Sequence, residues 1–123
     1  MEDNVFFLAV EAHVKWKIRL QNHLDGTSTE TLDPEVICQD NQCTLGQWIY
    51  GNGKKYGSLP TYEELRTTHA NFHRCAADII RKSDDGDKKT ARNLFEGPYV
   101  HLSRAITKHL VKMNAAVREL EQG

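Results

Sequence analysis

TYEELRTTHANFHRCAADIIRK, residues 61–82, is the stretch from which the architecture of this chain can be worked out. Apolar and histidine side chains recur along it at steps of three or four: Leu65, His69, Phe72, His73, Ala76 and Ile80. Such spacing predicts a long helix that turns one face toward a core. Thr61 and Glu64 fit a capping box after Pro60, and the polar run from Ser83 to Gly86 predicts the end of the helix.

The segments before and after this stretch have the same helical periodicity. Asn4 is a capping residue for a helix that runs through Leu24, and its inward stripe is Phe6, Ala9, His13, Trp16, Leu20 and Leu24. A further helix is expected at about 88–95, and Gly97-Pro98 then forces a break or kink. The last segment has its own stripe of Tyr99, Leu102, Ile106, Leu110, Met113, Val117 and Leu120, enough for bundle packing or a dimer seam.

The middle of the chain predicts shorter elements. Asp33-Pro34-Glu35 is typical of the start of a helical turn, and Asp40 and Asn41 are capping residues for a helix at about 42–50. Cys43 is therefore expected in a first helical turn. Neither strand alternation nor an internal repeat is found. The sequence predicts an all-α, four- to five-helix bundle in a single domain, residues 1–123, with a metal site between helices.

Composition excludes several classes of function. The formal net charge is −1, with acids and bases spread along the chain, so nucleic acid is not an expected partner. The apolar run 5–10 is far shorter than the roughly 20 residues that cross a bilayer, so we expect neither membrane insertion nor a signal peptide. Three cysteines are an odd number and argue against a disulfide framework, which favours a cytoplasmic location.

Histidines on apolar faces are the candidate chemistry. His69 and His73 are four residues apart, so both rings project from one face of a helix and can reach one ion. His13 lies between Ala9 and Trp16 on the stripe of another helix. Burying an imidazole without a partner is costly. These histidines are therefore either metal ligands or core residues hydrogen-bonded to a carbonyl or an acid.

Cys43 is the candidate fourth ligand. A first helical turn favours thiolate over thiol through the helix dipole and its free amides, and thiolate is the form that binds zinc. Cys75 is predicted to be a small core hydrophobe. Cys38 is left open between a resolving thiol, a substitute ligand and an ordinary loop residue. His109 is an alternative ligand to His13, and His23 and His101 are expected at the surface.

Three imidazoles and one thiolate form a ligand set that suits Zn2+ and excludes calcium and magnesium. Four protein ligands leave no open position for an activated water, so an enzyme is not expected. The motif His-Glu-x-x-His is also lacking, since Ala70 stands where that motif requires its general base.

The ordered motifs His13-x-x-Trp16, Cys43-Thr-Leu-Gly-Gln-Trp48 and His69-x-x-x-His73 resemble the bacterial chemoreceptor zinc-binding domain, often called CZB. The resemblance implies zinc bound by His13, Cys43, His69 and His73 within a helical bundle. The matching residues Trp16, Leu45, Gly46 and Trp48 are then expected to pack around the site and to keep water from it.

The resemblance also implies a role in bacterial signal transduction. Such domains are appendages of chemoreceptors or of diguanylate cyclases, which make cyclic di-GMP, and they often form homodimers. The expected signal is zinc availability, or an oxidant such as hypochlorous acid that attacks a redox-reactive Cys43. The alternative is a structural zinc site in a dimerisation module without a sensing role. Whether the chain is free-standing or part of a larger receptor stays open.

Overall fold

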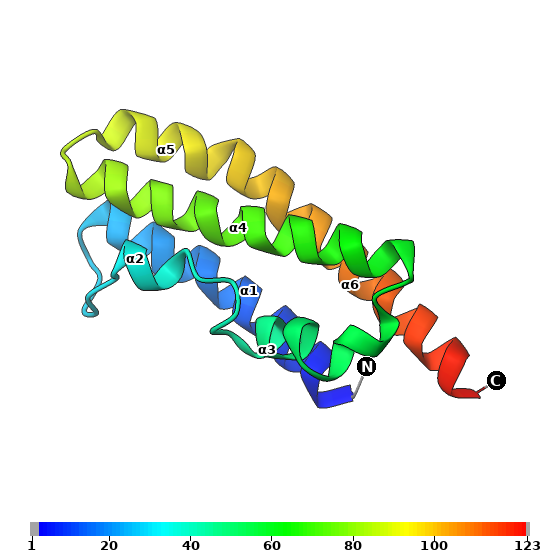
Figure 1. Ribbon diagram of the computed structural model, residues 1–123. Coiled ribbons are helices and arrows are strands. Elements are labelled where there is room, and N and C mark those ends of the chain that lie inside the picture. The colour runs from blue at the N-terminus through cyan, green and yellow to red at the C-terminus, as the bar shows by residue number, and fades with distance from the viewer. Residues whose placement is uncertain (1–2, 123) are drawn as a thin grey trace.

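The computed structural model describes residues 3–122, and these fold into helices and short connections (Figure 1). In chain order the elements are α1 (Asp3–Asp25), α2 (Pro34–Ile37), α3 (Thr44–Tyr50), the 3₁₀ helix η1 (Asn52–Tyr56), α4 (Pro60–Asp84), α5 (Lys88–Glu96) and α6 (Pro98–Gln122). No strand is present among these residues. The predicted all-α bundle is therefore confirmed.

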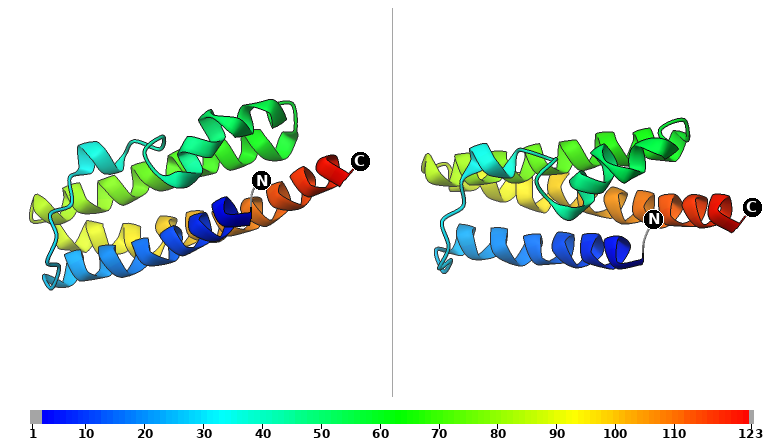
Figure 2. Two further views of the ribbon diagram at one scale, coloured as in Figure 1. Left: turned by 90° about the horizontal axis from the view of Figure 1, so that it is seen from below. Right: turned by 60° about the horizontal axis from the view of Figure 1, so that its bottom comes forward.

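Helix α4 is at the centre of the packing. It contacts α6, α5 and α2, whereas α1 packs mainly on α3, α4 and α6. Figure 2 shows that α5 and α6 follow each other in nearly one line beside α4. The interruption between them falls at Gly97-Pro98, where the sequence predicted a break. The short helices α2 and α3 connect α1 to α4, and this connection carries Cys43.

The predicted inward stripes form the core. The buried members are Ala9, Leu20, Leu24, Leu65, Phe72, Ala76, Ile80, Tyr99, Ile106, Leu110, Met113 and Val117. The two ends of the stripes differ from the prediction, because Phe6 is only half-buried and Leu120 is 55% exposed. The core is therefore less enclosed near the outer ends of α1 and α6, although Phe6 still packs against it.

The starts of three helices differ from the prediction. Helix α4 begins at Pro60 after Leu59, with no side-chain cap, so the capping box of Thr61 and Glu64 does not form. Proline fits the first helical position because its missing N–H would be unpaired there in any case. Asn4 lies within α1 rather than at its cap. Helix α3 begins at Thr44, and Cys43 itself is the N-cap in place of Asp40 or Asn41.

Two further features were not predicted. The 3₁₀ helix η1 follows α3 directly, in a glycine- and lysine-containing stretch without an apolar stripe. Helix α4 continues through Ser83 and Asp84 and ends before Gly86, whose φ of +88° favours glycine. Buried Ser83 accepts a hydrogen bond at 2.6 Å from Lys88, the first residue of α5, so its hydroxyl has a partner.

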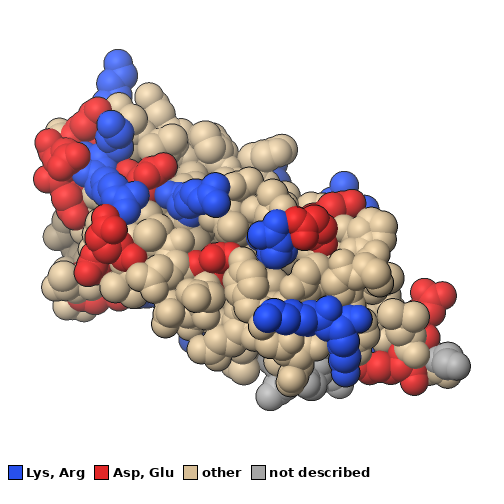
Figure 3. Space-filling view, viewed as in Figure 1, with Lys and Arg blue, Asp and Glu red and all other residues tan. Residues whose placement is uncertain are grey.

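The surface carries both signs of charge. On the face shown in Figure 3, the Lys and Arg side chains lie among the Asp and Glu side chains rather than apart from them. Interhelical ion pairs of this kind join Arg81 to Glu35 at 3.0 Å and Arg92 to Asp25 at 3.0 Å. None of the helices in the described part of the chain has the length and hydropathy needed to span a bilayer.

Candidate metal centre

Four candidate ligands from three parts of the fold lie together beside the core. His13 comes from α1, His69 and His73 from α4, and Cys43 from the N-cap of α3. The three histidines are buried, with 6%, 0% and 4% of their surface exposed, and Cys43 is half-buried. The helical stripes account for this placement, because each histidine occupies a core-facing position of its own helix.

Cys43, His69 and His73 point their ligand atoms at one another. Sγ of Cys43 lies 3.2 Å from Nε2 of His69 and 3.6 Å from Nε2 of His73. The two Nε2 atoms are 3.0 Å apart. Three donor atoms therefore surround one point between α3 and α4.

His13 of α1 adds a further nitrogen to the cluster. Its Nδ1–H donates to the carbonyl oxygen of Ala9 at 2.6 Å, which leaves Nε2 as the nitrogen with a free lone pair. That Nε2 is buried and has no hydrogen-bond partner. One ligand atom from each of His13, His69 and His73 lies within 4.8 Å of the other two. The unpaired nitrogen of His13 is therefore available to an ion in the cluster.

A backbone carbonyl also orients His73. Its Nδ1–H donates to the oxygen of Ile37 at 2.9 Å, and Ile37 is the last residue of α2. Hydrogen bonds of this kind fix the tautomer and the ring angle of metal-binding histidines. No partner is found for Nδ1 of His69, which is also buried. The sequence offered no signal for the Ile37 contact, because a carbonyl is common to every residue type.

Burial keeps the histidine rings neutral. Loss of solvation is the main cause that lowers the pKa of His13 to about 4 and the pKa of His69 to about 2. Burial also lowers the pKa of His73, although its bond to Ile37 opposes this shift. Neutral imidazole is the form that coordinates a metal. The site is therefore ready for a cation without first losing protons from these histidines.

Cys43 behaves differently from the sequence expectation. As N-cap of α3 it accepts a hydrogen bond from the amide of Gly46 at 3.4 Å, and such amides lower the pKa of the thiol. Burial outweighs them, so the pKa of Cys43 lies above its ordinary value. The prediction that position alone favours thiolate is therefore wrong for the metal-free chain. A bound cation would supply the missing stabilisation of the thiolate.

The separations among the ligand atoms of Cys43, His69 and His73 fit three corners of a tetrahedral ion. Ligand distances of about 2.0 to 2.1 Å for nitrogen and about 2.3 Å for sulfur place two nitrogens about 3.3 Å apart, and nitrogen and sulfur about 3.6 Å apart. The observed separations of 3.0, 3.2 and 3.6 Å lie close to these values. Without a metal, the buried Nε2 of His13 has no hydrogen-bond partner. A metal ion bound by the cluster would give this nitrogen a partner.

The residues expected to pack around the site fall into two groups. Leu45 and Gly46 are buried in the first turn of α3, and half-buried Trp16 lines a cavity that also borders Cys43. Trp48 is buried too, but it stacks on Tyr56 of η1 with ring centroids 6.1 Å apart. Trp48 therefore holds η1 against α3.

A cavity of about 400 Å³ leads to the centre. Cys43 and His73 line it together with Trp16 and Arg19 of α1. The Arg19 guanidinium lies 3.9 Å from the centre of the Trp16 ring and also binds Glu30. The side of the cluster that carries the sulfur is therefore open to small molecules.

The remaining cysteines lie outside the cluster of donor atoms. Cys75 is buried, and burial raises the pKa of its thiol to about 11, as suits a core position. Cys38 follows α2, and its thiol donates to the carbonyl oxygen of Glu35 at 3.3 Å. This contact gives Cys38 a local capping role and supports neither the resolving thiol nor the substitute ligand.

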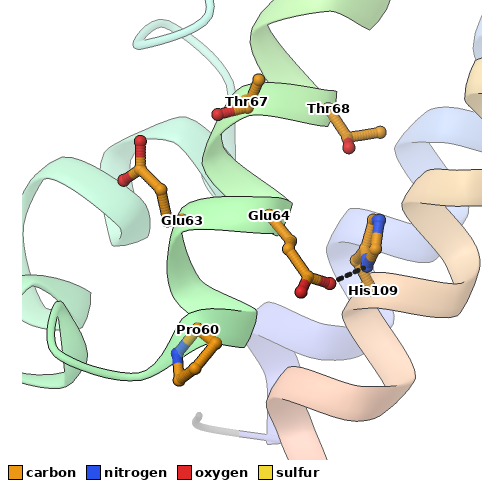
Figure 4. Close-up of a pocket in the computed structure, with 6 residues that line it drawn as sticks. All are labelled: Pro60, Glu63, Glu64, Thr67, Thr68 and His109. Atoms are coloured by element: carbon orange, nitrogen blue, oxygen red, sulfur yellow. Dashed lines mark ion pairs between the residues drawn. The ribbon is translucent and has the colours of Figure 1, made fainter.

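The remaining histidines also lie outside the cluster of donor atoms. His109 lies in a separate cavity of about 540 Å³ between α4 and α6, with Nδ1 3.3 Å from a carboxylate oxygen of Glu64 (Figure 4). It is therefore not an alternative to His13. His101 is exposed as predicted, whereas His23 is half-buried and its Nε2 lies 2.8 Å from Asp84.

Comparison with protein families supports the reading of the motifs. The sequence profile of the chemoreceptor zinc-binding domain matches residues 13–80. The match covers more than half of the 123 residues and spans all four clustered side chains. Neither the curated proteins nor the solved structures contain a significant match. The chain therefore belongs to the chemoreceptor zinc-binding domain family.

Proposed function

We propose that this chain is a zinc-binding sensory domain of bacterial signal transduction, in which His13, Cys43, His69 and His73 hold one Zn2+. The observation that carries the proposal is the convergence of Cys43 Sγ with Nε2 of His69 and His73, beside an unpaired Nε2 of His13. The family match supports it, because its description names zinc. Bound zinc would hold Cys43 as a thiolate and tie α1, α3 and α4 together.

Cys43 is the proposed redox-reactive group. Its sulfur borders the open cavity, whereas Cys75 is enclosed in the core. Hypochlorous acid would transfer chlorine to the thiolate, and water would then replace chloride to give a sulfenic acid. The sulfur is oxidised by two electrons and the chlorine is reduced to chloride. A sulfenic acid is a poorer ligand than a thiolate, so oxidation would weaken the tie between α3 and α4.

We place the chain in the cytoplasm, paired with a second copy and attached to or associated with a chemoreceptor or diguanylate cyclase output. The chain would then act on the output protein through a change in helix packing rather than through catalysis. A zinc sensor and an oxidant sensor differ in what removes the ion. The former exchanges zinc at physiological zinc activity, and the latter keeps it until Cys43 is oxidised.

The test is zinc content per chain by elemental analysis, on wild type and on Cys43→Ala, before and after a measured pulse of hypochlorous acid. One zinc per chain in wild type, lost after the pulse, is the result for an oxidant sensor. Zinc that survives the pulse but exchanges readily with a chelator favours the zinc sensor. Zinc that survives both treatments indicates the structural alternative, and an absence of zinc in wild type would refute the proposal.

A further inference from the structure

A chain of polar contacts joins the turn that carries Cys43 to the helix that carries His69 and His73. The Tyr50 hydroxyl, at the end of α3, donates to the Asp40 carboxylate, three residues before Cys43. This bond closes the segment 40–50 into a loop with Cys43 inside it. Both residues are half-buried, so the bond is shielded from water more than a surface contact is.

The backbone of Asp40 is held as closely as its side chain. Its carbonyl oxygen lies so near Gly46 that a Cβ added to this glycine would be 1.7 Å from it. Gly46 is also the residue whose amide donates to Sγ of Cys43. The backbone of Asp40 is therefore held against Gly46 in the first turn of α3, and its side chain is held by Tyr50, the last residue of α3.

Arg66 extends the chain to α4. Its guanidinium contributes to the electrostatic surroundings of the Tyr50 hydroxyl and binds Glu63, with Nε 3.0 Å from the carboxylate. The hydrogen bond that joins the two helices here runs from the Tyr62 hydroxyl of α4 to the carbonyl oxygen of Ile49, the residue before Tyr50, at 2.5 Å. Arg66 lies three residues before His69, so it shares a helix face with that histidine. The contacts Asp40–Tyr50–Arg66 thus run from the cysteine turn to the histidine helix without passing through the metal centre.

We propose that Asp40, Tyr50 and Arg66 form a positioning chain that holds the sulfur of Cys43 at the distance from His69 and His73 that a metal ion requires. The proposal rests on the assignment of these three residues as ligands. Ligand atoms must be held close to their bonding geometry, and loss of an outer contact typically lowers metal affinity by about 10- to 100-fold. None of the three positioning residues needs to touch the ion.

The test measures Co2+ binding by absorption, because a cobalt–thiolate band reports whether the sulfur is bound. Tyr50→Phe and Asp40→Ala should each lower Co2+ affinity by about 10- to 100-fold and should speed the reaction of Cys43 with a thiol reagent in metal-free protein. Asp40→Asn keeps an oxygen that accepts from Tyr50, so it should restore most of the affinity. Tyr56→Phe is the matched control, since its hydroxyl contacts Glu121, far along α6.

Each outcome bears on a different assignment. Wild-type affinity and thiol reactivity in both Tyr50→Phe and Asp40→Ala would overturn the positioning chain while leaving the metal site intact. Equal losses in Asp40→Asn and Asp40→Ala, or in Tyr56→Phe, would also overturn it. Wild-type protein that binds Co2+ without the thiolate band would instead remove Cys43 from the ligand set, and the positioning chain with it.

Discussion

At the scale of single residues, Cys43 combines two roles that a mutation can separate. Its sulfur caps α3 by accepting from the Gly46 amide, and it faces the ring nitrogens of His69 and His73. Alanine removes both roles, whereas serine is a good N-cap but a poor zinc ligand. The two variants therefore distinguish the loss of a helix cap from the loss of a ligand.

We expect Cys43→Ala and Cys43→Ser to lower zinc affinity strongly and to a similar extent. Only Cys43→Ala should also lose the cap, at a cost of about 1 kcal/mol in the unfolding free energy of the metal-free protein. Chelator competition and urea unfolding measure the two effects. Cys38→Ala and Cys75→Ala are the controls for affinity, and equal losses at all three cysteines would show that the wrong sulfur has been chosen.

The pH dependence of zinc binding should follow the proton of Cys43. Because burial raises the pKa of this thiol, zinc must displace one proton at neutral pH. His13 and His69, with pKa values of about 4 and about 2, are already deprotonated there. Apparent affinity should therefore rise about tenfold per pH unit from about pH 6 to 8. Isothermal calorimetry across this range measures it, and a flat profile would exclude the thiol.

At the scale of elements, the first turn of α3 depends on close approach of the preceding loop. The Asp40 carbonyl occupies the space where a side chain on Gly46 would stand. Leu45 on one side of this glycine is buried, and Gln47 on the other is exposed. Substitutions on the exposed face of this turn should therefore be tolerated, whereas a side chain at Gly46 would clash with the loop.

Gly46→Ala should move the 40–43 loop away from α3, because a Cβ cannot sit 1.7 Å from a carbonyl oxygen. The expected cost is about 1 to 3 kcal/mol in unfolding free energy, together with weaker zinc binding. Thermal unfolding and chelator competition check both effects. Gln47→Ala on the same helix removes only an exposed 3.4 Å hydrogen bond to the Gln42 carbonyl, so it should change both far less. Wild-type zinc binding by Gly46→Ala would contradict this expectation.

At the scale of the whole molecule, three neutral histidines inside the bundle make the metal-free protein sensitive to acid. Their pKa values lie below the ordinary value in the folded state and return to about 6.5 on unfolding. The unfolded chain therefore binds more protons below pH 6.5. Stability is complete above that pH and falls as pH decreases toward the folded-state values.

Urea unfolding of chelator-treated protein should give a lower unfolding free energy at pH 5 than at pH 7.5. Each histidine contributes up to about 1.4 kcal/mol per pH unit below 6.5. His101→Ala is the control, because this exposed residue should leave the pH dependence unchanged. Equal stability at both pH values would show that the three rings are not held neutral by burial.

The outer face of α1 is an exposed apolar surface on which the proposed homodimer would pair. Phe7, Val14 and Ile18 are 68%, 62% and 58% exposed and lie along one side of the helix. Glu11 and Lys15 stand beside them. Antiparallel pairing of this face with its copy would bury the apolar side chains and bring Glu11 of one copy near Lys15 of the other.

Val14→Asp should therefore convert the proposed dimer to a monomer, as measured by light scattering after size exclusion. Zinc content should stay unchanged, because Val14 faces away from the core. Val111→Asp on α6, at a residue with similar exposure, should leave the dimer intact. A dimer that survives Val14→Asp would exclude this face, and a loss at Val111 alone would move the interface to α6.

The sequence by itself determined the helices, the core stripes and the family. Helical spacing depends only on residue type and position, so the stripes containing Leu20, Phe72 and Ile106 could be identified without coordinates. The same spacing marked His69 and His73 as inward-facing partners. The four proposed ligands stay a prediction, but the three histidines lie on the inward faces where that spacing placed them, whereas Cys43 is the N-cap of α3 rather than a residue of its first turn.

Only the tertiary structure decided how those side chains are held. The Ile37 carbonyl selects the tautomer of His73, and residue type carries no signal for a carbonyl partner. Burial reversed the expected pKa shift of Cys43, because solvent exclusion depends on every element packed around the sulfur. The contact of Asp40 with Tyr50 likewise exists only once α3 has folded back on its own loop. The spacing of residue types along a helix thus specifies which side chains face inward, and long-range packing sets the tautomers and pKa values of those side chains.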